Sequence, residues 1–382
     1  MRVVIARALV GESTSMDVYA DKVSAALRQI RPDWQLIEVS PVPWAGAPGR
    51  YYEKFVGYPL RTVRQTADVF HVIDHSYGHL CPWLVRRGHP VVVTCHDLIN
   101  LKFPGELGKI ARFPALSAAA WRYAVRGLAA ANRLVAVSRN TLQDLTELTA
   151  QDPARTTVIP DGVDTVFTRL PPEAVNGLRR RIALPAGTVC LLHVGSSLPR
   201  KNIETMLDAV AVLNARGVAV RFLKVGADFT DRQKAIIRAA RLDGAITHLG
   251  RVDESTLVAA YNLADIFLFC SLYEGFGMPV LEAMACGTPV ITSDNSSLRE
   301  VAGDAAVLVD PLDAASIARE VERLVADRER TRTLVARGLQ RASQFGWLAV
   351  ARQLATLYTD LVAHRSEPLA VPPARLSKEG QR

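Results

Sequence analysis

Short runs of apolar residues, rich in Val, Ile and Leu, recur along the chain and alternate with stretches of helical periodicity. Near-continuous apolar runs of this kind are typical of strands buried on both faces of a parallel sheet. They predict strands at residues 3–6, 35–39, 69–73, 91–95, 134–137, 157–159, 189–194, 220–225, 246–249, 266–270, 290–292 and 306–309. Helices are predicted between them, most clearly at 202–216, 231–241, 254–264 and 314–326. The alternation predicts an α/β fold.

The predicted strands form two groups of six, separated by a stretch rich in Pro, Gly and Arg at residues 160–187. We therefore expect two doubly wound, Rossmann-like domains, at 1–165 and 175–346, that face each other across a cleft. A last helix at 347–364 has no strand after it and could pack back on the first domain. Residues 366–382 contain three prolines and many charges, and we expect them to be disordered.

Ligands of open parallel sheets bind beyond the carboxyl ends of the strands. The most informative loop at such a position is the sequence EGFGMPVLE at residues 274–282. Glu274 precedes the predicted helix and Glu282 lies about one turn inside it. The glycine-rich turn between them would expose backbone N–H groups at a helix N-terminus, where phosphate binds well. Because carboxylates accept hydrogen bonds from hydroxyls, the loop predicts a ligand with both phosphate and sugar.

A second loop, after the strand at 189–194, opens with Gly195 and continues to Arg200 and Lys201 at the start of a helix. Two cations are unfavourable at the positive end of a helix dipole, so this pair indicates a bound anion. The sequence matches neither GxxxxGK[ST] nor GxGxxG. The alternative interpretation is a solvated pair at a helix end.

Histidines follow two strands of the first half. His96 comes directly after the strand at 91–95, where it could donate a hydrogen bond or move a proton, or serve as a structural residue satisfied by backbone. The strand at 69–73 and the residues after it contain a polar cluster that could touch an acceptor: His71, Asp74, His75 and His79. No HExxH motif or Cys/His spacing supports a metal site.

Two loops carry helix-capping residues. Ser13 and Ser15 follow Gly11 and Glu12, and the sequence SDNSS at 293–297 precedes a predicted helix at about 298–301. Small hydroxyl and amide side chains at such positions are preferred N-caps. We expect capping in both places, with a further phosphate contact as the alternative.

The net charge of +8 is spread evenly, since residues 1–165 contain 19 Lys and Arg against 15 Asp and Glu. This distribution suits an anionic ligand or a peripheral contact with the inner face of an anionic membrane, and it does not resemble a nucleic-acid-binding arm. The five cysteines are scattered without a CxxC motif, which indicates reduced thiols in a cytoplasmic protein. No apolar run approaches the ~20 residues of a membrane span.

Over about residues 1–365 the chain resembles the retaining glycosyltransferases of family 4, group 1, which have the GT-B fold. The motifs that carry the resemblance are the segment 271–290 around Glu274 and Glu282, the loop 195–202, the sequence VIPDGVD at 158–164, and TCHDL at 94–98. The first is highly specific, and the others gain weight from their order. One departure is Gly11, which stands alone before Glu12 where the family often has paired glycines.

The resemblance implies roles for these residues. Glu274 would contact the donor sugar, Glu282 the ribose hydroxyls, and His96 would lie near the reacting sugar. The diphosphate would be held by Arg200 and Lys201 after Gly195, and by backbone groups around Phe276, Gly277, Met278 and Pro279. The donor would be a GDP-sugar or UDP-sugar, with no metal or other cofactor; the HDL sequence at 96–98 is a weak indication of GDP-mannose. The acceptor would be a saccharide or a lipid-linked saccharide.

The implied activity is transfer of a hexosyl unit to an acceptor hydroxyl in glycan or glycolipid biosynthesis. The absence of an Asp-x-Asp triplet fits a metal-independent enzyme. A glycosidase would place its two carboxylates on either side of one bond, and a nucleotide-sugar epimerase would show GxGxxG after its first strand. A catalytically silent sugar-nucleotide-binding protein is the remaining alternative.

Overall fold

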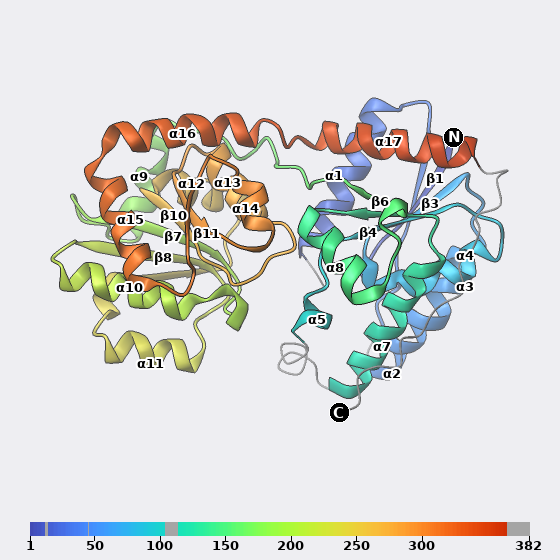
Figure 1. The fold of residues 1–382 in the computed structure, drawn as a ribbon, viewed down its shortest axis with the longest axis horizontal. Coiled ribbons are helices and arrows are strands. Elements are labelled where there is room, and N and C mark those ends of the chain that lie inside the picture. Colours follow the sequence, from blue (N-terminus) through green and yellow to red (C-terminus); the bar gives the residue numbers. More distant parts are fainter. Residues whose placement is uncertain (12–13, 45, 104–113, 365–382) are drawn as a thin grey trace.

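The computed structural model describes residues 1–11, 14–44, 46–103 and 114–364, so the predicted tail at 366–382 lies outside the described residues. The chain forms two six-stranded parallel sheets, one from each half of the sequence, which lie side by side in Figure 1. The α/β prediction is thereby confirmed. None of the helices in these ranges combines the length and apolarity needed to cross a bilayer.

The first sheet has the strand order β2-β1-β3-β4-β5-β6. Its strands are β1 (Arg2–Ala6), β2 (Gln35–Val39), β3 (Val69–Val72), β4 (Val91–Cys95), β5 (Arg133–Ala136) and β6 (Thr156–Val158). The helices of this half are α1 (Thr14–Ile30), α2 (Ala47–Tyr52), α3 (Tyr58–Thr62), α4 (Cys81–Val85), α5 (Ile99–Lys102), α7 (Pro114–Gly127) and α8 (Arg139–Thr149), with a π turn at Glu53–Gly57 between α2 and α3.

The second sheet has the order β12-β11-β10-β7-β8-β9. Its strands are β7 (Val189–Gly195), β8 (Val220–Gly226), β9 (Ile246–Gly250), β10 (Ile266–Phe269), β11 (Val290–Ser293) and β12 (Val307–Val309). Its helices are α9 (Asn176–Arg181), α10 (Ile203–Ala215), α11 (Asp231–Ala239), α12 (Glu254–Leu263), α13 (Met278–Ala285), α14 (Ser296–Ala302), α15 (Ala314–Ala326) and α16 (Arg328–Ala342). Strand order reverses between β7 and β10, a topological switch point where such sheets bind ligands.

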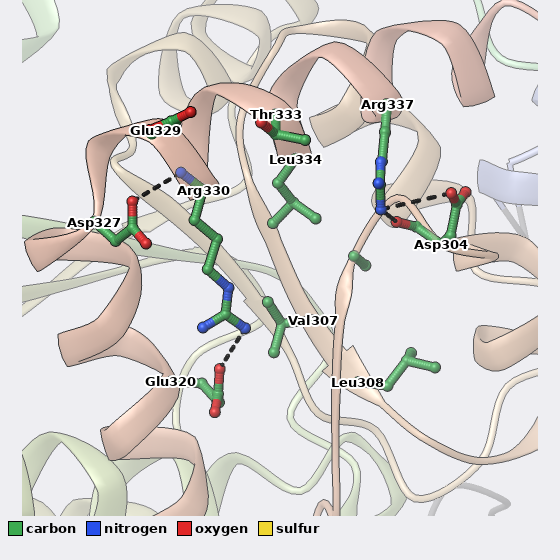
Figure 2. A pocket seen from close by; sticks show the side chains of 11 residues that line it. Asp304, Val307, Leu308, Glu320, Asp327, Glu329, Arg330, Thr333, Leu334 and Arg337 are labelled. Atoms are coloured by element: carbon green, nitrogen blue, oxygen red, sulfur yellow. Dashed lines mark hydrogen bonds and ion pairs between the residues drawn. The ribbon is translucent and has the colours of Figure 1, made fainter.

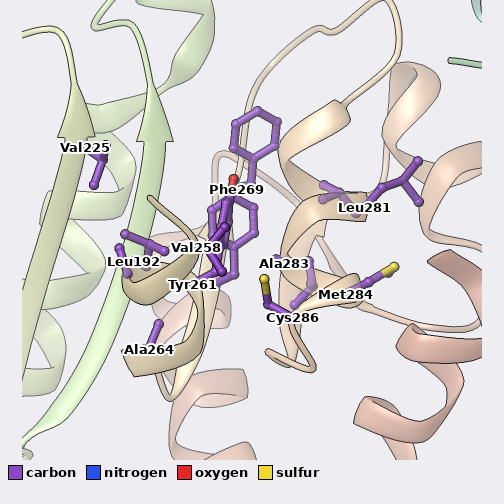
Figure 3. Close-up of a cluster of buried hydrophobic side chains, with 14 of the residues drawn as sticks. Leu192, Val225, Val258, Tyr261, Ala264, Phe269, Leu281, Ala283, Met284 and Cys286 are labelled. Carbon is purple, nitrogen blue, oxygen red and sulfur yellow. The ribbon is translucent and has the colours of Figure 1, made fainter. Parts of the chain in front are cut away.

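Both faces of each sheet are covered by apolar clusters, as the continuous apolar strands require. On one face of the second sheet, Tyr261 of α12, Leu281 of α13 and Phe269 of β10 belong to one buried apolar cluster (Figure 3). On the other face, α10 and α15 cover the sheet with fully buried Leu207 and Ile317. These layers fix the ends of β7 and β10 and hence the loops that follow them.

The last helix, α17 (Trp347–Ala363), leaves the second half and packs beside α1 on the first (Figure 1). Its Tyr358 hydroxyl lies 2.5 Å from Nδ1 of His71, whose Nε2 lies 2.7 Å from the Thr94 hydroxyl. Burial lowers the pKa of His71 to about 3, so the ring is neutral. The proposal that His71 faces an acceptor is therefore wrong: it is a core residue that docks α17.

The chain crosses between the halves twice, and the crossings touch. The N–H of Val163 donates to the carbonyl of Phe345 at 2.7 Å. A Cβ on Gly162 would lie 2.8 Å from the backbone nitrogen of Trp347. The two connections therefore form one paired hinge.

Away from this hinge, the two halves meet where α8 packs against the loop after β10. The carbonyl of Gly275 accepts hydrogen bonds from the hydroxyls of Ser138, at 2.7 Å, and Thr141, at 3.1 Å. Beside it, the Tyr273 hydroxyl accepts from the Asn140 amide at 2.6 Å and donates to the buried carboxylate of Asp144. The segment that contains Glu274 is thus held by the first half of the chain.

Gly275 is the tightest point of this contact. A Cβ at this position would lie 2.0 Å from the carbonyl oxygen of His96 and 2.7 Å from Cβ of Asp97. Because real atoms do not approach so closely, any larger residue must push the two halves apart.

We use the word seam for this contact between the two halves, where the loop at 273–275 packs against α8 and against His96 and Asp97. We predict that Gly275→Ala opens the structure at this seam. The clash should cost on the order of 1–3 kcal/mol, as overpacking does. Small-angle scattering should show a larger radius of gyration than that of the wild type. Gly244→Ala is the matched control, since no atom lies within 4 Å of its Cβ. An unchanged radius in Gly275→Ala, with the same thermal midpoint as the control, would contradict the tight contact.

Candidate active site

The candidate site lies at the switch point of the second sheet. The loop after β7 brings Arg200 and Lys201 to the start of α10, and the loop after β10 brings Glu274 to the start of α13. β7 and β10 are hydrogen-bonded neighbours, although about seventy residues separate their loops in the sequence. The topology therefore joins the two motifs that the sequence singles out.

Glu274 forms a buried charge cluster with both cations. Its Oε2 lies 3.0 Å from a guanidinium nitrogen of Arg200, and its Oε1 lies 2.5 Å from Nζ of Lys201. Burial raises the pKa of Glu274, but Lys201 and Arg200 outweigh it, so the pKa is lowered overall. For Lys201 burial dominates and lowers its pKa. The lowered pKa of Glu274 keeps this carboxylate ionised between the two basic side chains.

The backbone of the loop is shaped by glycine and serine. Gly277, at φ +119°, precedes α13, where Pro279 occupies the first turn. Ser297 Oγ lies 2.9 Å from the carbonyl oxygen of Glu274 and 2.6 Å from that of Phe276. The serines after β11 therefore hold this loop. The prediction that they cap α14 is wrong, because its N-cap Asn295 makes no side-chain capping bond.

Glu282 lies apart from the charge cluster. It is half-buried on α13 and accepts a hydrogen bond from the Tyr261 hydroxyl at 2.7 Å. Burial raises its pKa to about 7. The structure thus separates the two glutamates by environment: Glu274 is a paired anion, whereas Glu282 titrates near neutrality beside an apolar cluster.

His96 lies on the other side of the seam and is buried. Its Nε2 lies 2.9 Å from the carbonyl oxygen of Ile73, and its Nδ1 lies 4.0 Å from a carboxylate oxygen of Asp161. The Tyr19 ring packs edge-on against it at 4.6 Å between centroids. The Nε2 atom is therefore engaged by the backbone, whereas Nδ1 has no hydrogen bond within the described residues and faces Asp161.

Asp161 is a site residue that was not singled out from the sequence. Its Oδ1 is buried without a hydrogen-bond partner, and burial raises its pKa to about 6. It belongs to the VIPDGVD sequence at 158–164, which marked the position without indicating that the side chain faces His96. Tyr273, which joins the loop of Glu274 to α8, was also missed, because only the packing of the two halves reveals it.

Gly195 ends β7 with φ +147°. A Cβ there would lie 3.6 Å from Nε2 of His193 and 3.8 Å from Cε of Lys201. The predicted glycine therefore lies beside the charge cluster. In the other half, Gly11 is described, whereas Glu12 and Ser13 of the predicted first loop lie outside the described residues.

Two hollows in the described part of the chain lie away from the charge cluster. The larger, of about 710 Å³, lies at the opposite edge of the second sheet, where Asp304 and Arg337, and Glu320 and Arg330, form ion pairs (Figure 2). The smaller, of about 280 Å³, is lined by Asp161 and Phe276 from the two sides of the seam. Within the described ranges no group of three or more His, Cys, Asp or Glu side chains could hold a metal ion.

Comparisons with known families match both halves of the chain. A family model described as glycosyl transferases group 1 matches residues 176–341, and one described as Glycosyltransferase Family 4 matches residues 3–167. Each match covers one of the two sheets.

Among curated relatives, a D-inositol 3-phosphate glycosyltransferase of Thermobispora bispora is 31% identical over 334 residues, which are 82% of this chain and 77% of that protein. The O-antigen chain mannosyltransferase B of Escherichia coli is 34% identical over 171 residues, 44% of this chain and 45% of the relative.

Solved structures share the fold. Sucrose-phosphate synthase from Thermosynechococcus elongatus superposes with a TM-score of 0.76 at 23% identity, over 95% of this chain and 99% of that one. HepE of Anabaena in complex with UDP-glucose superposes with a TM-score of 0.75 at 17% identity, over 94% and 100%. The two sheets thus form the GT-B arrangement, and the chain belongs to the group 1 glycosyltransferases of family 4.

Proposed function

We propose that this glycosyltransferase moves a hexosyl unit from a nucleotide diphosphate sugar to an acceptor hydroxyl, with retention at the anomeric carbon. The observation that carries the proposal is the cluster of Glu274 with Arg200 and Lys201 at the switch point. Two cations beside a glycine-rich helix start suit a diphosphate, and a carboxylate between them suits sugar hydroxyls.

The two cations would stabilise the charge that develops on the leaving diphosphate. Such preorganised donors contribute roughly a few kcal/mol each in a site that excludes water. In the proposed step the bond from the anomeric carbon to the phosphate oxygen breaks and a bond to the acceptor oxygen forms on the same face. The acceptor proton passes to the leaving phosphate oxygen. Glu274 and His96 position the sugar.

In this structure the Glu274 carboxylate forms ion pairs with both Arg200 and Lys201. A diphosphate would compete for them, because phosphate oxygens form the same charge-assisted hydrogen bonds as a carboxylate. Donor binding would then release Glu274 from one or both cations and free its oxygens for the sugar. The site would change from an internal ion cluster to a ligand-bound one without moving the sheet.

We propose a mannosyl donor linked to GDP as the first candidate. Mannosyltransferases of Escherichia coli recur among the relatives, one at 28% identity over 78% of this chain and 38% of its own length. The binding of UDP-glucose by HepE makes UDP-glucose the second candidate. For the acceptor, the names of the relatives suggest an inositol phosphate or a growing O-antigen saccharide.

The alternative is a protein that binds the sugar nucleotide without turnover. We predict that one member of a panel of GDP-sugars and UDP-sugars binds and is slowly hydrolysed or transferred, and that EDTA leaves this activity intact.

Arg200→Ala and Lys201→Ala should each weaken binding of the nucleoside diphosphate roughly 10- to 100-fold, the value of one charge-assisted hydrogen bond. Calorimetry measures the binding, and NMR of the product measures its anomeric configuration.

Arg216→Ala is the control, since Arg216 forms an exposed ion pair with Glu322 in the same half of the chain. Its affinity should match that of the wild type. Failure of every donor to bind would reject the proposal. Tight binding of a sugar nucleotide without turnover would support the alternative, a catalytically silent binding protein.

We also propose a peripheral contact with an anionic membrane surface, through the run from Trp44 to Leu60. Trp44 and Tyr52 are 52% and 53% exposed and contact each other, with ring centroids 6.2 Å apart. Val56 and Leu60 continue the exposed apolar stripe, whereas Tyr58 on the same run is fully buried. Exposed arginines flank the stripe at positions 50 and 64. Aromatic and aliphatic side chains with flanking cations are typical of helices that lie in a membrane interface.

We predict that the wild type sediments with vesicles of phosphatidylglycerol and phosphatidylcholine and much less with phosphatidylcholine alone. The double variant Trp44→Ser, Tyr52→Ser should lose roughly tenfold or more of its partitioning, because it removes most of the exposed aromatic area. Leu312→Ser is the control, since Leu312 is 70% exposed in the other half of the chain. Equal sedimentation of all three proteins with the vesicles would show that this surface does not bind the membrane.

A further inference from the structure

Lys224 is a fully buried lysine in the middle of the second sheet. It lies on β8 directly opposite His193 of β7 and has no exposed surface. Its Nζ donates to the carbonyl of Gly195 at 3.2 Å and to the carbonyl of Ala227. Lysine is rarely buried without an anionic partner, so its presence here requires an explanation.

Lys224 forms no direct ion pair with an acid of the described residues. Within the described part of the chain, no carboxylate oxygen lies within 4.0 Å of its Nζ. The nearby Asp228 is exposed and pairs with Lys234 at 2.6 Å and with His248 at 3.4 Å. Burial lowers the pKa of Lys224 to about 8, so the side chain is still largely protonated at neutral pH.

The carboxylate of Asp228 acts on Lys224 only through space, where it raises the pKa of the lysine without outweighing burial. Burial lowers the pKa of His193 to about 3, so this ring is neutral. The ring of Phe229 lies 5.5 Å from Nζ and offers only a weak cation–π contact. The ammonium group is therefore a buried positive charge held by two carbonyl dipoles.

Its position links it to the candidate site. The carbonyls it binds belong to Gly195, which ends β7, and to Ala227, which directly follows β8. Gly195 also lies close to Lys201, since a Cβ on this glycine would lie 3.8 Å from Cε of the lysine. The loops are tightly packed, since a Cβ on Gly226 would lie 2.3 Å from the Gly195 carbonyl oxygen. Lys224 thus lies directly beneath the loop that leads to Arg200 and Lys201.

A purely structural role would need only a hydrogen-bond donor. A neutral amide could bind both carbonyls without the cost of burying a charge. The positive charge becomes useful when an anion occupies the loop above it, because charges act strongly through a poorly polarisable interior.

We propose that Lys224 is a third cation for the diphosphate of the sugar nucleotide, acting from beneath the Gly195 loop as a positioning residue. This inference rests on the proposed function, since it assumes a nucleoside diphosphate above that loop. Lys224 holds the loop in place through its two hydrogen bonds and adds its charge to those of Arg200 and Lys201. The nucleoside part of the donor lies outside its influence.

The test compares a ligand that carries the diphosphate with one that lacks it. Lys224→Gln keeps a neutral donor and Lys224→Met removes it, while Lys234→Met removes an exposed lysine of the same domain as the control. Binding of GDP or UDP, whichever the wild type binds, is measured by calorimetry. Binding of the matching nucleoside, guanosine or uridine, is measured by ligand-observed NMR, and thermal midpoints report folding.

Both Lys224 variants should bind the diphosphate roughly tenfold more weakly, as expected for one charge at a distance of several ångströms. Their nucleoside affinity should stay within about twofold of the wild type, and Lys234→Met should bind both ligands normally. Unchanged diphosphate affinity in Lys224→Gln would overturn the inference, as would an equal loss for nucleoside and diphosphate, which indicates a collapsed loop. If the wild type binds and turns over its donor in these cases, the proposed function survives. If the wild type binds neither GDP nor UDP, the proposed function and the inference about Lys224 both fail.

Discussion

The buried ion cluster of Glu274 with Arg200 and Lys201 is the interaction on which the site depends. A carboxylate in this position would be costly to bury alone, and each cation would repel the other without it. The cluster is possible because the second sheet reverses its strand order between β7 and β10, which places two distant loops at one edge. Apolar layers on both faces keep the two strands together.

The same loop forms the seam between the two halves of the chain. The residues on either side of Glu274 bind α8: Tyr273 through Asn140 and Asp144, and Gly275 through Ser138. The position of the carboxylate is therefore coupled to how closely the halves approach. A transfer reaction benefits from such coupling, because closure excludes water that would hydrolyse the donor.

Much of this architecture was predictable from local sequence patterns. Short apolar runs located the strands of the described residues, with ends that differ by a residue or so. The signal is strongest for the inner strands such as β4 and β10, which are buried throughout. The helix α16 was not predicted, because its many arginines obscure the apolar stripe that packs on α13. The short helices around the π turn at Glu53–Gly57 also have no clear periodicity.

Arg200, Lys201 and Glu274 lie together, whereas Glu282 lies apart from them, and the contacts of these residues were not predictable. Motifs reveal which residue types follow a strand, and they do not reveal which of them pair across a sheet edge. Glu274 was expected to face a sugar, and in this state it faces both cations. Lys224 falls within the strand predicted at 220–225, and a single lysine in the sequence carries no sign of its burial.

The central claim is that Glu274 and the donor diphosphate share the same two cations. It is tested most directly by the affinity of Glu274→Gln for GDP, or for UDP if the wild type prefers it, measured together with sugar transfer. The neutral amide has nearly the same shape and no longer competes for Arg200 and Lys201. If the carboxylate and the diphosphate compete for these cations, the variant should bind the nucleoside diphosphate more tightly and lose sugar transfer. Weaker binding of the diphosphate, or transfer at the wild-type rate, would contradict it.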